Sequence, residues 1–320
     1  MRILLWHVHG SWTTAFVEGT HTYLLPAVPG RGPDGRGRAR TWDWPASAEE
    51  ITPAELRHAE VDVVVLQRPE DERLATRWLG RRPGRDIPAV WLEHNAPQGR
   101  INDLRHPAAD RPDLRIVHVT HTNRLFWDCG RTPTTVIEHG VLDPGHRYSG
   151  ELDRAAVVVN EPVRRARVVG TDLLDELSAV IPLDVFGMAV AGLAESPRPR
   201  IAVHEDLPQD RLHTDMARRR LYLHPVRWTS LGLSLIEAML LGMPVVALAT
   251  TEVPDAVPTG AGVVSNRMEV LTGAIEQLRR DVDAARAAGA AARRAALDRY
   301  GLKRFLADWD RVLEEVVRGC

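Results

Sequence analysis

Short apolar runs alternate with polar and helix-forming stretches along the whole chain. In the first half, such runs occupy residues 2–8, 61–66, 88–93, 116–119 and 134–137. Several are rich in valine and isoleucine, the composition typical of buried parallel strands. Strands that alternate with helical segments predict an α/β fold in which crossover helices cover a parallel sheet.

A second alternating series follows in the other half. Strands are expected over residues 155–159, 183–189, 200–203, 221–225 and 244–249. Helices are expected over residues 122–129, 170–180, 232–241, 270–296 and 302–317, the last with a clear apolar stripe. Residues 9–12 are expected to form the loop after the first strand, and residues 29–40 a further loop rich in glycine, proline and arginine.

The length of 320 residues suits two domains. Residues 142–153 are polar and contain Pro144, Gly145 and Gly150, as a linker would. The expected domains are therefore residues 1–148 and 149–320, each built like a Rossmann fold.

Charge and composition give no reason to expect a nucleic-acid-binding, metal-binding or membrane protein. The net charge of −2 gives no electrostatic reason to expect a nucleic acid as partner. Cys129 and Cys320 lie far apart, so they indicate a reducing compartment and form no metal motif. No run of about 18 apolar residues could span a membrane, and the first nine residues read as a strand, with no signal peptide. A cytoplasmic protein is expected; oligomeric state is left open.

The most informative stretch lies between the strand at 221–225 and the following helix. Thr229 and Ser230 offer hydroxyls that could cap a helix, and Gly232 permits close approach of a ligand. A helix start presents free backbone N–H groups that suit a diphosphate, and Glu237 lies about one turn further in. Taken alone, the pattern favours an ordinary βαβ crossover with Glu237 as a surface carboxylate.

The same stretch resembles the retaining glycosyltransferases of family 4. Those enzymes carry Glu-Gly-Phe-Gly-Leu, then a Glu-Ala-Met helix, then Gly-x-Pro-Val-Val. This chain has Thr-Ser-Leu-Gly-Leu at 229–233, Glu-Ala-Met at 237–239 and Gly-Met-Pro-Val-Val at 242–246, with matching spacing. The resemblance continues through residues 252–255 and 260–264.

Weaker resemblances extend over most of the chain. They involve residues 136–141 before the linker, Glu93-His94-Asn95-x-Pro97 at a strand end, and the last helix with Arg304, Phe305 and Trp309. The resemblance implies the GT-B fold: two Rossmann-like domains with a cleft between them. It also implies that the helix over 302–320 crosses back to the N-terminal domain.

The resemblance implies roles for single residues. Glu237 matches the glutamate that binds the donor ribose hydroxyls, and the helix start at Ser230, Leu231, Gly232 and Leu233 matches the diphosphate-binding amides. Arg165 is our choice for the arginine that neutralises the leaving diphosphate, with Arg164 or Arg167 as substitutes. Residues 204–207 occupy the place where the nucleobase is read.

Two positions depart from the family pattern. Thr229 stands where a glutamate touches the transferred sugar, so a hydroxyl replaces a charge there. Val169 stands where a lysine is expected. These departures suggest an altered donor preference or a loss of activity, and Thr229 remains a catalytic candidate.

In the N-terminal half, Gly10 follows the first strand, where the backbone would pass close to the diphosphate. His94 follows another strand, and such carboxyl ends are where parallel sheets place functional groups. A catalytic His94 and a merely structural one are equally compatible with the sequence.

The expected function is transfer of a sugar, with retention, from a nucleoside-diphosphate sugar to the hydroxyl of a small-molecule or saccharide acceptor. Neither a metal nor a cofactor is expected. Alternatives are a catalytically idle homologue that acts as a binding or activating partner, and a nucleotide-sugar epimerase. A dinucleotide enzyme is disfavoured because neither first strand is followed by Gly-x-Gly-x-x-Gly.

Overall fold

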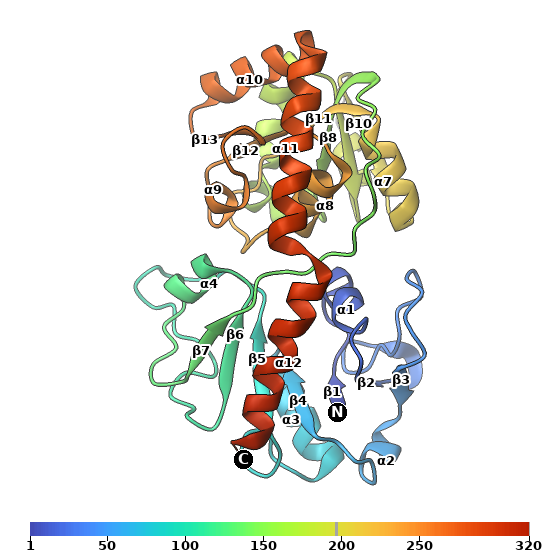
Figure 1. Cartoon of the computed structure of the whole chain (residues 1–320), viewed down its shortest axis with the longest axis vertical. Helices are drawn as coiled ribbons and strands as arrows, with labels where there is room; N and C mark the ends of the chain where they lie inside the picture. Colours follow the sequence, from blue (N-terminus) through green and yellow to red (C-terminus); the bar gives the residue numbers. More distant parts are fainter. Residues whose placement is uncertain (196–197, 320) are drawn as a thin grey trace. The chain divides into compact units, whose positions relative to one another are not determined.

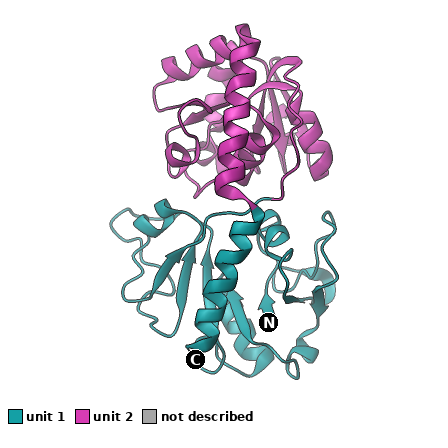
Figure 2. Cartoon of the chain, viewed as in Figure 1, with its two compact units in different colours: residues 1–141, 302–320 teal, residues 142–301 magenta. Residues whose placement is uncertain are grey.

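The computed structural model describes residues 1–195 and 198–319; Cys320 lies outside them. The chain forms two units (Figure 2). Unit 1 comprises residues 1–141 and 302–320, and unit 2 comprises residues 142–301. Each unit is built around its own parallel sheet, so the expected α/β class with two Rossmann-like sheets is confirmed.

Unit 1 contains a parallel sheet with the strand order β3-β2-β1-β4-β5-β6-β7. Its strands are β1 (Arg2–Leu5), β2 (Thr22–Pro26), β3 (Ala48–Ile51), β4 (Val63–Leu66), β5 (Ala89–Glu93), β6 (Arg115–His118) and β7 (Thr134–Val136). The chain leaves β1 toward one edge and returns to β4 on its other side, which is the strand order of a Rossmann sheet.

Helices follow most of these strands, and one more helix comes from the end of the chain (Figure 1). They are α1 (Gly10–Phe16), the 3-10 turn η1 (Pro29–Arg31), α2 (Pro53–Leu56), α3 (Pro69–Leu79), α4 (His121–Phe126) and α12 (Leu302–Arg318). Leu74 and Trp78 of α3 pack against Leu66 of β4 and Trp91 of β5 in one buried cluster. The apolar side of α3 therefore faces the sheet and its other side faces outward.

The last helix packs onto unit 1. Phe305, Trp309 and Leu313 are buried, as the apolar stripe predicts. The Trp309 ring lies 5.5 Å from Trp12 and 5.1 Å from Phe16 of α1, measured between ring centroids. The C-terminal helix thus completes the aromatic core that α1 begins.

Unit 2 contains a second parallel sheet with the order β10-β9-β8-β11-β12-β13. Its strands are β8 (Leu152–Val158), β9 (Leu183–Gly187), β10 (Ile201–Glu205), β11 (Arg219–His224), β12 (Val245–Leu248) and β13 (Gly262–Ser265). The centre of this sheet is formed by β8 and β11, between which the direction of winding reverses. Ligands bind α/β sheets at the carboxyl ends of the strands beside such a reversal.

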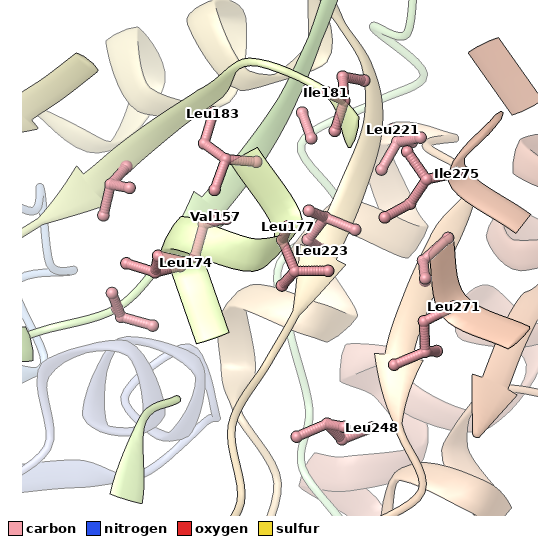
Figure 3. Packing of buried hydrophobic residues seen from close by; sticks show 14 of the residues in the cluster. Val157, Leu174, Leu177, Ile181, Leu183, Leu221, Leu223, Leu248, Leu271 and Ile275 are labelled. Carbon is pink, nitrogen blue, oxygen red and sulfur yellow. The ribbon is translucent and has the colours of Figure 1, made fainter. Parts of the chain in front are cut away.

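Ten helical segments of unit 2 are found in the described residues. They are α5 (Pro162–Arg165), η2 (Ala166–Val168), η3 (Thr171–Leu173), α6 (Leu174–Val180), η4 (Ala191–Glu195), α7 (Gln209–Ala217), α8 (Leu233–Leu241), α9 (Val253–Ala256), α10 (Met268–Arg280) and α11 (Val282–Tyr300). Figure 3 shows Leu177 of α6 and Ile275 of α10 among side chains from β8, β9 and β11. This cluster forms a core on one face of the sheet.

Several expectations need correction. Residues 9–12 are not simply a loop, since α1 begins at Gly10. The segment expected as a linker is bound to unit 2, because Arg147 N and Tyr148 N donate to Leu241 O at 3.1 and 3.0 Å. The unit boundary accordingly falls after residue 141, whereas we expected it after residue 148. The single helix expected over 270–296 is two helices, because the Asp281 side chain accepts a bond from Ala284 N and starts α11.

Candidate functional site

Two loops meet at the carboxyl ends of the central strands of unit 2. One follows β8 and the other follows β11. The amides of Arg227 and Trp228 donate to Val168 O at 2.9 and 3.2 Å. Gly170 (φ +77°) packs so tightly that a Cβ there would lie 2.1 Å from Pro225 O. These contacts bring the arginine-rich loop beside the segment that leads into α8.

Helix α8 begins without a side-chain cap. Its N-cap is Gly232, which has no side chain to accept a bond, and in the first turn Leu235 N donates to Gly232 O at 3.0 Å. We expected Thr229 or Ser230 to cap the helix, and this was wrong, because the helix begins only at Leu233. A capping side chain must directly precede the first helical residue. N–H groups that lack a partner at a helix start can donate hydrogen bonds to an anion.

A buried histidine lies behind this helix start. His224 ends β11, is 2% exposed, and its Cε1 lies 2.8 Å from where a Cβ on Gly232 would stand. Its Nδ1 lies 3.3 Å from the Tyr222 hydroxyl, which in turn contacts Ser234 Oγ at 3.0 Å. Burial lowers the pKa of His224 to about 4, so the ring is neutral at pH 7. The Nε2 atom has no partner among the described residues.

Replacing Gly232 with alanine tests this packing. The new methyl group would overlap the His224 ring, so the ring or the helix start must shift. We expect Gly232→Ala to weaken nucleoside-diphosphate binding by about tenfold, since a small displacement of the amides weakens charge-assisted bonds. Calorimetric titration measures this, with Gly273→Ala as the control because a Cβ there meets nothing within 4 Å. Equal affinities in the two variants would contradict the close packing.

Glu237 is buried one turn into α8. It is 6% exposed, and its Oε2 lies 3.4 Å from Nε2 of His213 on α7. The alternative of a surface carboxylate is therefore wrong. His213 also contacts Gln209 at 2.9 Å. The carboxylate thus lies beside a polar partner rather than in hydrocarbon, as a ligand-binding group requires.

The three candidate arginines after β8 differ in their partners. Arg164 forms an ion pair with Glu161 at 2.5 Å, and Arg167 forms one with Asp172 at 2.8 Å. The Arg165 side chain has no hydrogen bond or ion pair with any residue that the structure describes, although its backbone N donates to Glu161 O at 2.9 Å. Burial, followed by the charge of Arg164, lowers the pKa of the Arg165 guanidinium from its usual value. Of the three arginines, Arg165 is the one whose side chain forms no ion pair with a described residue, as a phosphate-binding residue should.

The two departures from the family pattern have different structural settings. Val169 is 2% exposed and belongs to the core of unit 2, so that position takes an apolar side chain here. Thr229 is half-buried in the loop before α8. Near the expected nucleobase position, His204 Nε2 contacts Asp184 at 3.1 Å and its ring stacks on Phe186.

Three histidines gather at the strand ends of unit 1. His9 follows β1, His94 follows β5 and His139 follows β7. The rings of His9 and His94 are 4.0 Å apart, and His94 and His139 are buried. His94 Nε2 and both ring nitrogens of His139 have no hydrogen-bond partner among the described residues. Gly10 lies beside this cluster in sequence, and a Cβ there would lie 2.6 Å from the Trp42 ring.

This cluster predicts a loss of stability in mild acid. Burial lowers the pKa of His9 to about 4 and of His139 to about 3, and it lowers the pKa of His94 as well. Between about pH 6.5 and pH 4 these histidines bind protons in the unfolded chain but stay neutral in the folded chain. Stability should therefore fall as pH decreases through this window, by about 1.4 kcal/mol per pH unit for each such histidine.

Urea unfolding between pH 7.5 and 5 measures this slope. His139→Gln should make it shallower, because one buried imidazole no longer resists protonation. A free energy of unfolding that is the same at pH 7.5 and pH 5 would contradict the prediction.

The structure separates the predicted residues into two groups. Arg164, Arg165 and the segment from Thr229 to Glu237 lie in unit 2. Gly10 and His94 lie in unit 1. Sequence reasoning assigned no role to His213 or His224 and did not place His9 beside His94. Only the position of His224 at the end of a predicted strand could have drawn attention to it.

Comparison with known proteins finds a sequence likeness over part of unit 2. Residues 193–295 match the family model of the glycosyl transferases group 1, a range that includes β11, α8 and Glu237. No curated protein matches the chain by sequence. This match shows that residues 193–295 are similar to the glycosyl transferases group 1, and the two parallel sheets of the whole chain have the GT-B arrangement.

Solved structures resemble the whole chain. Sucrose-phosphate synthase from Thermosynechococcus elongatus has a TM-score of 0.77 at 13% identity, with 100% of both chains covered. HepE from Anabaena, in complex with UDP and glucose, has a TM-score of 0.72 at 15% identity and covers 98% of this chain and 100% of its own. A glycosyltransferase from Rickettsia africae has a TM-score of 0.71 at 14% identity and covers 100% of this chain and 99% of its own. The GT-B fold expected from the sequence is confirmed.

Proposed function

We propose that the chain is a retaining glycosyltransferase that moves a sugar from a nucleoside-diphosphate sugar to an acceptor hydroxyl. The observation that carries this proposal is the unpaired Arg165 on a loop bonded to the segment that leads into α8. A guanidinium without a carboxylate partner and a set of uncapped amides are complementary to a diphosphate. Glu237, one turn further along α8, is the proposed ligand of the ribose hydroxyls.

In the proposed reaction, the bond between the anomeric carbon and the diphosphate oxygen breaks as the acceptor oxygen bonds to that carbon. The acceptor attacks from the face that the diphosphate leaves, which retains the anomeric configuration. The acceptor proton passes to a phosphate oxygen. Arg165 and the first amides of α8 stabilise the negative charge that develops on the leaving group. Thr229 can donate a hydrogen bond to the transferred sugar but cannot supply a charge.

The acceptor is proposed to bind unit 1 near His94. The orphaned Nε2 of that neutral ring can exchange a hydrogen bond with a hydroxyl. No helix in residues 1–195 and 198–319 is both long and apolar enough to cross a bilayer. We propose a dissolved acceptor and a cytoplasmic location.

The counter-charge is proposed to come from arginine, without a metal or a cofactor. Within the described ranges, no group of three or more histidine, cysteine or acidic side chains is arranged to hold an ion. Turnover in the presence of EDTA, compared with turnover after adding Mg²⁺ or Mn²⁺, tests this part of the proposal.

The second candidate function is that of an idle homologue that binds a nucleotide sugar and activates a partner. Thr229 favours it, because the charge near the anomeric carbon is missing. The purified chain should be incubated with a panel of nucleoside-diphosphate sugars and sugar acceptors. Release of the nucleoside diphosphate, with an anomeric proton coupling that matches the donor, supports the retaining transferase. Nucleotide binding without turnover supports the idle homologue, and a donor converted to its epimer supports an epimerase.

A further inference from the structure

A second cationic site lies along the outer face of α3 in unit 1. A cavity of about 490 Å³ is lined by Pro69, Glu72, Arg73, Thr76 and Arg77 of that helix. These positions form one stripe, at the i, i+3, i+4, i+7 and i+8 spacing. The opposite side of the helix packs on the sheet, as described above. The five residues that line the cavity therefore lie on the side of α3 that does not pack on the sheet, where a ligand could reach them.

Three more arginines complete the wall. Arg82 and Arg85 come from the loop before β5, and Arg111 comes from the segment before β6. Residues that precede parallel strands lie at the amino ends of the sheet, whereas the candidate residues His94 and Gly10 follow strands at its carboxyl ends. The cavity is thus separate from the candidate site residues of unit 1.

The carboxylates around this cavity are already paired. Glu72 accepts from Arg111 at 2.9 Å, and Asp86 accepts from Arg82 at 2.8 Å. Asp113 bonds Arg111 at 2.8 Å and lies 3.7 Å from Arg85. The three carboxylates are therefore paired with the three arginines Arg82, Arg85 and Arg111.

The remaining two arginines have no such partner. The side chains of Arg73 and Arg77 form no hydrogen bond or ion pair with any described residue, and the two residues stand four positions apart on the same face of α3. Like charges at that spacing repel each other. The cavity carries an excess of positive charge that an anion would neutralise.

The geometry points to this cavity as a binding site for a small phosphorylated ligand, separate from the donor site. Guanidinium groups donate paired hydrogen bonds that match phosphate oxygens. The volume lies in the range of small-molecule sites, and the cavity is open to solvent. A soluble phosphate ester or diphosphate fits these features, and Arg73 and Arg77 are the residues that would hold it.

Calorimetric titration of the full-length chain with inorganic pyrophosphate tests the site. The titration is made in an Arg165→Ala background, so that binding at the proposed donor site is weakened. Adding Arg73→Gln and Arg77→Gln should weaken the remaining binding at least tenfold. The matched control is Arg286→Gln with Arg294→Gln, two exposed arginines of α11, which remove the same charge elsewhere and should leave the affinity unchanged.

Identical pyrophosphate affinity with and without Arg73 and Arg77 overturns the inference. So does binding to phosphatidylglycerol vesicles without any binding of pyrophosphate, which would mark a membrane-facing surface. If Arg165→Ala does not affect turnover, the result contradicts the proposed function only. The pyrophosphate affinities with and without Arg73 and Arg77 are both measured in the Arg165→Ala variant, so their ratio still tests the second site.

Discussion

Replacing Arg165 with alanine is expected to lower the rate of glycosyl transfer by about 100-fold or more, with little change in melting temperature. Removing one group that stabilises developing charge typically costs this much in kcat. The Arg165 side chain has no ion pair or hydrogen bond with the described residues, so its replacement removes no polar side-chain bond of the folded chain. Steady-state kinetics with a nucleoside-diphosphate sugar, together with a thermal melt, measure both quantities.

Arg167→Ala is the matched control for this prediction. Arg167 lies two residues further on and is paired with Asp172, which keeps its second partner Arg227 at 2.5 Å. Turnover should change by no more than about twofold, since a surface ion pair contributes little. If Arg165→Ala instead loses stability in proportion to turnover, Arg165 is structural.

Replacing Glu237 with alanine is expected to weaken nucleoside-diphosphate binding by about 100-fold. Each hydrogen bond to a charged group contributes about 1.5–3 kcal/mol, and a ribose diol offers two. Tenfold in affinity corresponds to about 1.4 kcal/mol. Isothermal titration calorimetry, at a temperature where the variant is fully folded, gives the ratio of dissociation constants.

His213→Gln separates binding from positioning at Glu237. The His213 imidazole lies 3.4 Å from the Glu237 carboxylate. It can therefore hold the carboxylate in position, while the negative charge belongs to Glu237 itself. An intermediate loss of affinity is expected. Nucleotide affinity that is unchanged in Glu237→Ala would remove Glu237 from the ribose role.

The central strands were predictable because each is a local run of apolar residues. β4 and β12 are apolar throughout and buried at every position. β3 was missed because its sequence is Ala-Glu-Glu-Ile, in which both glutamates face solvent at the sheet edge. α1 was missed because it begins with glycine and contains two threonines, while its burial comes from α12 far along the chain.

The same distinction applies to the site. The segment from Thr229 to Glu237 was predictable because its residues are contiguous and its spacing is local. The choice among Arg164, Arg165 and Arg167 depends on which carboxylates reach them, and Glu161 and Asp172 are assigned only by the folded loops. The histidine beside Glu237 comes from α7, whose short polar sequence gave no helical pattern strong enough to be expected.

The division of unit 1 into two stretches of chain has a consequence for biosynthesis. As the protein leaves the ribosome, the rings of Trp12 and Phe16 have no α12 to cover them until residues 302–318 have been made. The uninterrupted stretch 142–301 can fold before then. Nascent chains that pause late in translation should therefore expose an aromatic surface that chaperones recognise, and a stop codon just before Leu302 should yield an aggregation-prone product.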